Sequence, residues 1–450
     1  MTVNDMIAEA LRHTTDTKAC EIGRGAIADA PAMFCRLFPG ATAIVVADDN
    51  TWRVAGRRVQ ADLEANGVPA AKPYVFAASG LFAEWDYVMT LERALKSVNA
   101  IPIAVGSGVI NDLCKLVAHR LGRRYMVLGT AASMDGYTAA NAAITKDGMK
   151  QTMNCRAPLG CIADSRIAAE APAEMTASGY ADLIAKIPAG ADWMLADAIG
   201  SEPIHPEAWK FVQDPLRDSL SNPEKCAAGD VGEIEKLCSG LVMSGFAMQA
   251  MDSSRPASGT EHQVSHYWDM EGLSVDGRHV SHGFKVGIGT LVSTKTLEFL
   301  LRQDLTHLDV EAAVAKWWPD FESVKATFPR VYGSRTAHIR RAELEYAGKF
   351  PSREALRREL GDVKAKWPDL SARIAAQLMP FEEVREKLAA VGAPVEPELI
   401  GVTRARLRET YLGVPYMRAR YFGLDLVERL GLMPALTDEL FGTGGVWEVA

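Results

Sequence analysis

The stretch IPIAVGSGVINDLCKLVAHRLG, residues 101–122, joins a short apolar run to a glycine-containing turn and a helical pattern. Ile101 to Val105 is typical of a buried strand. Five apolar residues beyond the turn recur at helical spacing before Gly122: Ile110, Leu113, Cys114, Val117 and Leu121. The helix would begin directly after GSG, where backbone N–H groups and the helix dipole favour a phosphate. We therefore expect one strand–turn–helix unit of a nucleotide-binding sheet. An ordinary tight turn is the alternative, since Asn111 stands where the usual fingerprint has its third glycine.

Similar apolar runs lie on both sides of this unit. They are Thr42–Ala47, Tyr74–Ala78 and Tyr125–Thr130, and helical segments separate them. This alternation predicts a doubly wound parallel sheet, with ligands beyond the carboxyl ends of the strands. The pair Asp147-Gly148 adds a hairpin signal.

The pattern changes near Ala163, where long helical segments replace short strands. We expect an α/β, Rossmann-like cofactor domain over 1–163 and an all-α domain for metal and substrate over 164–450. The clearest helical patterns cover 173–198, 231–251, 262–270, 285–302, 352–359 and 370–378. At 450 residues, two domains are the natural expectation.

Composition narrows the class of protein. Hydrophobic residues make up 48% and charged residues 24%, as in soluble enzymes, and the formal charge of -8 argues against a nucleic-acid partner. The seven cysteines are scattered without a C-x-x-C pair, which favours a reducing compartment. We see no secretory signal and no apolar stretch of the ~18 residues that a membrane span needs. We expect a cytoplasmic protein, with a homodimer as the default assembly.

The segment SSRPASGTEHQVSHYWDMEGLSVDGRHVSHGFKVGIG, residues 253–289, concentrates histidine. His262 and His266 are four residues apart, so on a helix they project roughly 40° apart. His282 follows and precedes a glycine. A catalytic divalent metal takes three protein ligands, and imidazole with carboxylate suits zinc, nickel or ferrous iron. Asp182 is our candidate for the carboxylate, although no spacing rule links it to the histidines. The alternative is that these histidines are structural or exposed, as we expect for His119 and His279.

Six segments in this order resemble the superfamily of glycerol dehydrogenase, iron-containing alcohol dehydrogenases and dehydroquinate synthase. Within it, the likeness is strongest to the sn-glycerol-1-phosphate dehydrogenase family. The segments are VGSGVINDLCK (105–115), GTAASMDGYTA (129–139), SGYADLIAKI (178–187), SSRPASGTEHQVSH (253–266), SHGFKVGIGTL (281–291) and MRARYFGLDLVERLG (417–431). The resemblance implies the dehydroquinate synthase-like architecture, a nicotinamide cofactor, NAD or NADP, and one divalent metal, with zinc ahead of nickel or iron.

The resemblance also implies roles for single residues. The metal ligands would be Asp182, His262 and His282, and His266 would lie beside nicotinamide and substrate as a proton relay. The cofactor residues would be Asp48 at the adenosine ribose, Gly106, Gly108, Asn111 and Asp112 at the pyrophosphate turn, and Thr130 and Ser133. Asp135 would contact the hydroxyl side of the substrate and count as catalytic. Phe284 departs from the family, because many relatives carry a glutamate there.

A phosphorylated substrate needs a cationic or N–H-rich cradle. Our candidates are Arg255, Lys186, four residues from Asp182, and Lys285, three from His282. Plainer interpretations stay open: a helix cap or solvated residue for Asp182, a turn for Asp135, the polar end of a strand for Asp48, and a surface ion pair for Arg255.

The expected reaction is the interconversion of dihydroxyacetone phosphate and sn-glycerol 1-phosphate. Three alternatives remain: a dehydroquinate synthase-like carbon-oxygen lyase, a polyol dehydrogenase acting on an unphosphorylated substrate, and a non-catalytic binding protein on the same scaffold. Asp48 favours NAD, since a carboxylate repels a 2′-phosphate.

Overall fold

The computed structural model describes residues 3–147, 149–317 and 319–449, and the chain divides into two compact units. Unit 1 comprises Met1–Leu183, Pro206–Ala257 and Ala390–Ala393. Unit 2 comprises Ile184–His205, Ser258–Ala389 and Pro394–Ala450. The boundary that we expected near Ala163 falls inside a strand of unit 1.

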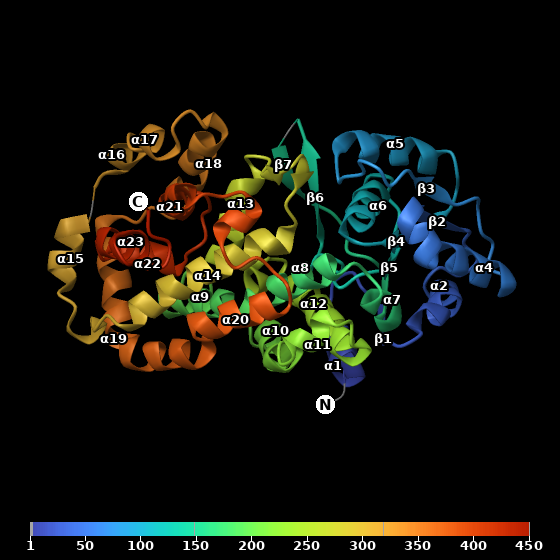
Figure 1. Ribbon diagram of the computed structural model, residues 1–450, viewed down its shortest axis with the longest axis horizontal. Coiled ribbons are helices and arrows are strands. Elements are labelled where there is room, and N and C mark those ends of the chain that lie inside the picture. The colour runs from blue at the N-terminus through green and yellow to red at the C-terminus, as the bar shows by residue number, and fades with distance from the viewer. Residues whose placement is uncertain (1–2, 148, 318, 450) are drawn as a thin grey trace. The chain divides into compact units, whose positions relative to one another are not determined.

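Unit 1 is built on a parallel six-stranded sheet, which confirms the predicted fold class (Figure 1). The strands are β1 (Ala19–Gly23), β2 (Ala43–Asp48), β3 (Tyr74–Phe76), β4 (Ile101–Gly106), β5 (Met126–Gly129) and β8 (Gly160–Asp164), in the order β1-β8-β5-β4-β2-β3. The apolar runs predicted β2 to β5. They missed β1 and β8, which have five residues each, and Glu21 interrupts the apolar pattern of β1.

One face of the sheet packs against α2 (Ala30–Leu37) and α4 (Arg57–Ala65). Phe34, Val59 and Leu63 share one buried cluster with strand residues such as Val45 and Val105. The predicted helix after GSG is α6 (Gly108–Arg120), which lies against β4 and against α5 (Trp85–Lys96). It ends as expected before Gly122, whose φ of 68° is left-handed.

Unit 1 contains further elements outside the six-stranded sheet. The hairpin signal is confirmed by β6 (Asn141–Lys146) and β7 (Met149–Asn154), which pair antiparallel, although Gly148 lies outside the described residues. The remaining helices are α1 (Val3–Ala10), α3 (Asp49–Thr51), α7 (Ser165–Ala169), α10 (Pro206–Ser219), α11 (Pro223–Ala227) and α12 (Val231–Met251). Helix α8 (Ala173–Ile184) ends where unit 2 begins.

Unit 2 is mainly helical, as predicted. Its helices are α9 (Lys186–Ala198), α13 (Thr260–Asp269), α14 (His282–Leu301), α15 (Val310–Trp317), α16 (Phe321–Lys325), α17 (Phe328–Tyr332), α18 (Thr336–Ala347), α19 (Arg353–Gln377), α20 (Phe381–Ala390, whose last residue belongs to unit 1), α21 (Arg404–Gly413), α22 (Gly423–Arg429) and α23 (Met433–Phe441). The two-residue strands β9 (Ser274–Val275) and β10 (Arg278–His279) are an exception to the all-α expectation.

Two helix boundaries differ from the prediction. The segment 173–198 forms two helices, α8 and α9, which meet at Ala185. Conversely, the separate helices expected over 352–359 and 370–378 are one helix, α19, with Pro368 in its interior. An interior proline removes one hydrogen bond, but the buried stripe of Leu356, Leu360, Trp367 and Leu370 continues across it. Tertiary packing outweighs the local penalty.

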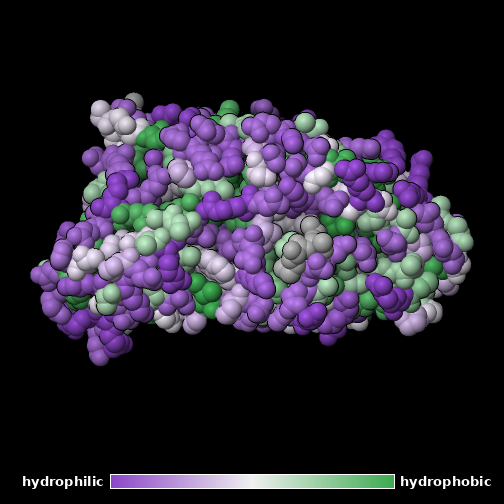
Figure 2. Space-filling view, turned by 90° about the horizontal axis from the view of Figure 1, so that it is seen from below, coloured by the Kyte–Doolittle hydropathy of each residue, from purple (hydrophilic) through white to green (hydrophobic). Residues whose placement is uncertain are grey.

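Figure 2 shows one face on which hydrophilic residues predominate and hydrophobic residues form small, scattered groups. Among the described residues, we find no helix with the length and apolar character needed to cross a membrane.

Candidate active site

The three predicted histidines come together in unit 2. His262 lies in the first turns of α13, and His282 is the first residue of α14. Their ring centroids are 5.4 Å apart. The ring of His266 is 6.5 Å from that of His262 and 6.4 Å from that of His282. Spacing therefore identified a real cluster of imidazoles, while His119 and His279 are exposed, as expected.

A close crossing of α13 and α14 produces this cluster. A Cβ at Gly289 would lie 2.4 Å from the carbonyl oxygen of Glu261. Only glycine permits the two backbones to approach so closely. The beginning of α13 is fixed from a third helix, because Asp192 of α9 accepts a hydrogen bond from the N–H of Thr260 at 2.8 Å. The histidines thus sit on rigid elements.

Glu261 orients His262. The glutamate is fully buried, accepts a hydrogen bond from the N–H of Gly259 at 2.6 Å, and has Oε1 2.7 Å from Nδ1 of His262. A ring that donates its Nδ1 proton to a carboxylate presents Nε2 as the lone pair for a metal. The sequence pattern missed Glu261. Its signal was a charged residue within an otherwise small and polar run, directly before a candidate ligand.

His266 and Lys285 share a carboxylate. Nδ1 of His266 is 3.6 Å from Asp269, and the ammonium of Lys285 makes a short ion pair with the same side chain. Desolvation lowers the pKa of His266 below its usual value near 6.5, and Asp269 acts in the opposite direction. The side chain of His266 is 39% exposed and is therefore accessible to a ligand. Its lowered pKa leaves the ring neutral at pH 7.

In unit 1, the loop after β5 carries a second group of predicted residues. Oδ2 of Asp182, on the last turn of α8, accepts a hydrogen bond from the N–H of Asp135 at 3.0 Å. Ser244 of α12 donates to the carboxylate of Asp135 at 3.0 Å. Asp182 is fully buried, so its interpretation as a solvated residue is wrong. Asp135 is buried and held from two helices, which is more than a turn requires.

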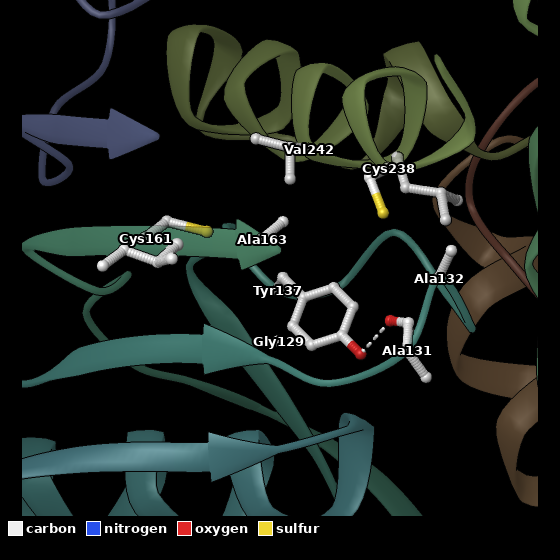
Figure 3. A pocket seen from close by; sticks show the side chains of 10 residues that line it. Gly129, Ala131, Ala132, Tyr137, Cys161, Ala163, Cys238 and Val242 are labelled. Carbon is white, nitrogen blue, oxygen red and sulfur yellow. Dashed lines mark hydrogen bonds between the residues drawn. The ribbon is translucent and has the colours of Figure 1, made fainter. Parts of the chain in front are cut away.

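Tyr137 fastens the same loop (Figure 3). Its hydroxyl donates to the carbonyl of Ala131 at 2.6 Å, and its ring lies against Gly129 at the end of β5. The ring lines a small apolar cavity together with Cys161 of β8 and Cys238 of α12. Thr130 is buried at the start of this loop, and Ser133 is partly exposed, with its hydroxyl 3.4 Å from that of Tyr137.

In the turn between β4 and α6, a glycine shapes the backbone and the side chain of Asn111 holds the turn in place. A Cβ at Gly106 would lie 2.6 Å from Cβ of Ile110, so the tight turn requires glycine. Asn111 is fully buried, accepts a hydrogen bond from Tyr125 at 3.0 Å and donates to the carbonyl of Gly136 at 3.3 Å. Asn111 thus ties the turn to the loop after β5.

Asp112 and Lys115, on the same helix, add to this support. Asp112 accepts a hydrogen bond from the N–H of Ala143 at 3.1 Å. The buried ammonium of Lys115, which sequence reasoning did not single out, donates to the carbonyls of Gly136 and Asn141 at 2.7 and 2.9 Å. The sequence signal for this residue was a lysine within an apolar helix face, which indicates a buried charge.

Asp48 stands at the end of β2, as predicted, and its side chain acts locally. Oδ1 accepts hydrogen bonds from the N–H groups of Asn50 and Thr51 at 2.8 and 2.9 Å, while Thr51 bonds back to the N–H of Asp48. This arrangement is a capping box.

Two of the predicted phosphate-binding cations are fully buried. Arg255 lies in a short 3-10 helix of unit 1, and Lys186 is the first residue of α9 in unit 2. The alternative of a surface ion pair for Arg255 is therefore wrong.

Comparisons with known proteins agree with this architecture. Residues 21–172 match the family described as iron-containing alcohol dehydrogenase. The glycerol dehydrogenase structure from Schizosaccharomyces pombe superposes with a TM-score of 0.60 over 94% of this chain and 90% of that one, at 15% identity, which shows a common fold.

Curated relatives narrow the family. A glycerol-1-phosphate dehydrogenase [NAD(P)+] from Bacillus licheniformis is 28% identical over 97% of this chain and 95% of its own length. The protein of that name from Bacillus subtilis is 33% identical over 58% of this chain and 67% of its own length. This chain therefore belongs to the glycerol-1-phosphate dehydrogenase family.

Proposed function

We propose that this chain interconverts dihydroxyacetone phosphate and sn-glycerol 1-phosphate, with NADH or NADPH as the hydride donor and a divalent metal as cofactor. The observation that carries the proposal is the approach of His262 and His282, whose rings lie 5.4 Å apart on a rigid helix pair. The names of the relatives supply the substrate and the cofactor class.

The donors fit a catalytic metal. Asp182, His262 and His282 are one carboxylate and two imidazoles, a set that could hold an ion, and the bond of His262 to Glu261 is the usual support for such a ligand. We propose zinc, with nickel or ferrous iron as the alternatives. When bound, such a metal supplies Lewis-acid polarisation of the C2 oxygen of the substrate.

His266 is our candidate for proton transfer. Its Nδ1 faces Asp269, so Nε2 is the nitrogen that would take the proton of the C2 hydroxyl during oxidation and return it during reduction. The ring is neutral at pH 7 because desolvation lowers its pKa, and it can therefore accept this proton. Asp135 would hold the substrate hydroxyls.

The cofactor would bind beyond the carboxyl ends of the strands. We propose that Gly106 and Gly108 let the pyrophosphate approach the backbone, and that Thr130 and Ser133 contact the nucleotide. Asn111 and Asp112 would act by holding the turn and the loop in place, since both side chains are hydrogen bonded to neighbouring segments.

The substrate phosphate requires a cationic partner. We propose Arg255, Lys186 and Lys285 as candidates, and the ammonium of Lys285 also pairs with Asp269. We also propose a cofactor role for 1–163, a metal and substrate role for 164–450, a homodimer, a cytoplasmic location and no nucleic-acid partner.

The test follows absorbance at the NADH band with dihydroxyacetone phosphate or plain dihydroxyacetone, in chelated samples and in samples restored with zinc or nickel. We expect reduction of the phosphate ester alone, and none after chelation. Reaction of only the unphosphorylated compound would indicate a polyol dehydrogenase. Phosphate release from a sugar phosphate without net NADH change would indicate the lyase.

A matched pair of histidine substitutions distinguishes a role in the candidate active site from an exposed position without such a role. His266→Gln should lower kcat and change its pH profile, whereas His279→Gln, at an exposed position of β10, should leave both unchanged. Equal effects of the two substitutions would contradict the role of His266.

A further inference from the structure

The carboxyl end of β2 presents a positive group as well as the acidic one. In parallel nucleotide-binding sheets this strand end meets the adenosine ribose, where a carboxylate suits the 2′-hydroxyl of NAD and an arginine suits the 2′-phosphate of NADP. Here Oδ1 of Asp48 is occupied by the N–H groups of Asn50 and Thr51. The carboxylate is therefore turned toward its own helix.

Asp49 is also engaged. Its Oδ2 accepts a hydrogen bond from the N–H of Ala78, beyond β3, at 3.3 Å. Each of the two acidic side chains at this strand end thus has one carboxylate oxygen hydrogen bonded to backbone N–H groups. Their charges still oppose a phosphate, but neither side chain is positioned solely for a ligand.

The side chain of Arg53 folds back toward this strand end. Its Nε donates to the carbonyl of Asp49 at 3.0 Å, and its guanidinium donates to the side-chain oxygen of Asn50 at 2.5 Å. Long side chains on a helix point toward its N-terminus, and these two bonds hold Arg53 in that direction. An exposed guanidinium consequently lies beside Asn50, one residue beyond Asp49 at the carboxyl edge of the sheet.

Arg53 lies within a helical irregularity. Trp52–Gly56 forms a π-helical turn, with the N–H of Arg57 bonded to the carbonyl of Trp52. A π turn carries one residue more than an α turn and is frequent at functional sites. A Cβ at Gly56 would lie 2.6 Å from the Trp52 ring, so glycine accommodates this turn. Arg58 lies beyond it and pairs with Asp62 at 3.4 Å.

We propose that Arg53, held by Asn50, binds the 2′-phosphate of NADP(H), while Asp48 and Asp49 keep NAD(H) acceptable. Arg53 would then offset the preference for NAD that Asp48 alone suggests. A guanidinium binds phosphate through charge-assisted, bidentate hydrogen bonds, a geometry that lysine cannot copy. The inference rests on the proposed function only in that a nicotinamide cofactor binds.

The test is a calorimetric titration of the full chain with 2′,5′-ADP and with ADP, which differ in where the second phosphate is attached. We expect Arg53→Ala to weaken binding of 2′,5′-ADP about 10- to 100-fold, the usual loss for a charge-assisted hydrogen bond to phosphate. Binding of ADP should change less than twofold, and Arg53→Lys should be intermediate. Arg58→Ala is the matched control and should bind both ligands as the unchanged protein does.

Two results would overturn the proposal. Equal weakening of both ligands would mean that Arg53 supports the helix, and unchanged binding of 2′,5′-ADP would place its phosphate elsewhere. The titration contains neither dihydroxyacetone phosphate nor metal. A protein that fails to reduce the substrate can therefore still show the Arg53 effect, and failure of the two proposals is distinguishable.

Discussion

Gly289→Ala tests the crossing of α13 and α14 on which the histidine cluster depends. The added Cβ would stand 2.4 Å from the carbonyl oxygen of Glu261 and 2.9 Å from its Cα, where ordinary contact begins at 3.4 Å. The helices must separate by about 1 Å, because both opposing atoms belong to a helix backbone and cannot rotate away. Overpacking of this kind costs about 1–3 kcal/mol of unfolding free energy.

The same displacement should loosen the metal site. His262 follows Glu261 directly, so a shift of α13 carries its ring away from His282. Loss of orientation around a metal ligand typically weakens binding about 10- to 100-fold. Urea unfolding would measure the stability change, and competition with a chelating dye would measure zinc affinity.

Gly361→Ala in α19 is the matched control. A Cβ at this helical position meets nothing within 4 Å, so the substitution should stabilise by about 0.5–1 kcal/mol through helix propensity alone. If Gly289→Ala behaved like Gly361→Ala, keeping both stability and zinc affinity, the close crossing would not be what positions the histidines.

Three further substitutions probe separate supports. Glu261→Gln should weaken zinc binding about 10- to 100-fold, since it removes the charge facing His262; unchanged affinity in the dye competition would contradict this. Lys115→Met should cost about 2–4 kcal/mol in urea unfolding and raise KM for NADH, because the part-buried carbonyls of Gly136 and Asn141 lose their donor. Burial lowers the pKa of His338 below 6.5, so below that pH the unfolded state binds the extra proton and stability falls. His338→Gln should remove up to about 1.4 kcal/mol per pH unit of this loss between pH 6.5 and 5, and an unchanged slope would refute the assignment.

The fold could be predicted from the sequence where a segment that is buried in the structure also has a clear apolar periodicity. The strands β2, β4 and β5 and the helix α6 are largely buried runs whose apolar spacing is strong enough to identify them. β1 fails this criterion, because it is a short edge strand that contains Glu21 and pairs only with β8, far along the chain. The prediction for α19 erred in the other direction: two helices were expected, but one helix continues past Pro368, because its packing outweighs the local penalty of the proline. Short-range sequence patterns cannot predict the energy of packing between segments that are distant in the sequence.

Spacing predicted part of the histidine cluster, but not the contacts around it. Spacing placed His262 and His266 on one helix face, and the structure confirms that they lie close together. It could not show that Asn111, at the position of a missing fingerprint glycine, is buried and bonded to Tyr125. Burial depends on what covers a side chain, and that cover comes from segments distant in sequence.

Lys285 shows how a contact that the sequence does not reveal changes a functional interpretation. It lies three residues after His282 on one helix, as expected, and was a candidate cation for a substrate phosphate. Asp269, on the preceding helix, neutralises it and also approaches His266. A phosphate would have to displace a buried carboxylate to reach this ammonium, and the freed Asp269 would remain beside His266, the proposed proton relay. We therefore propose that Lys285 also fixes Asp269, and through it the orientation of His266.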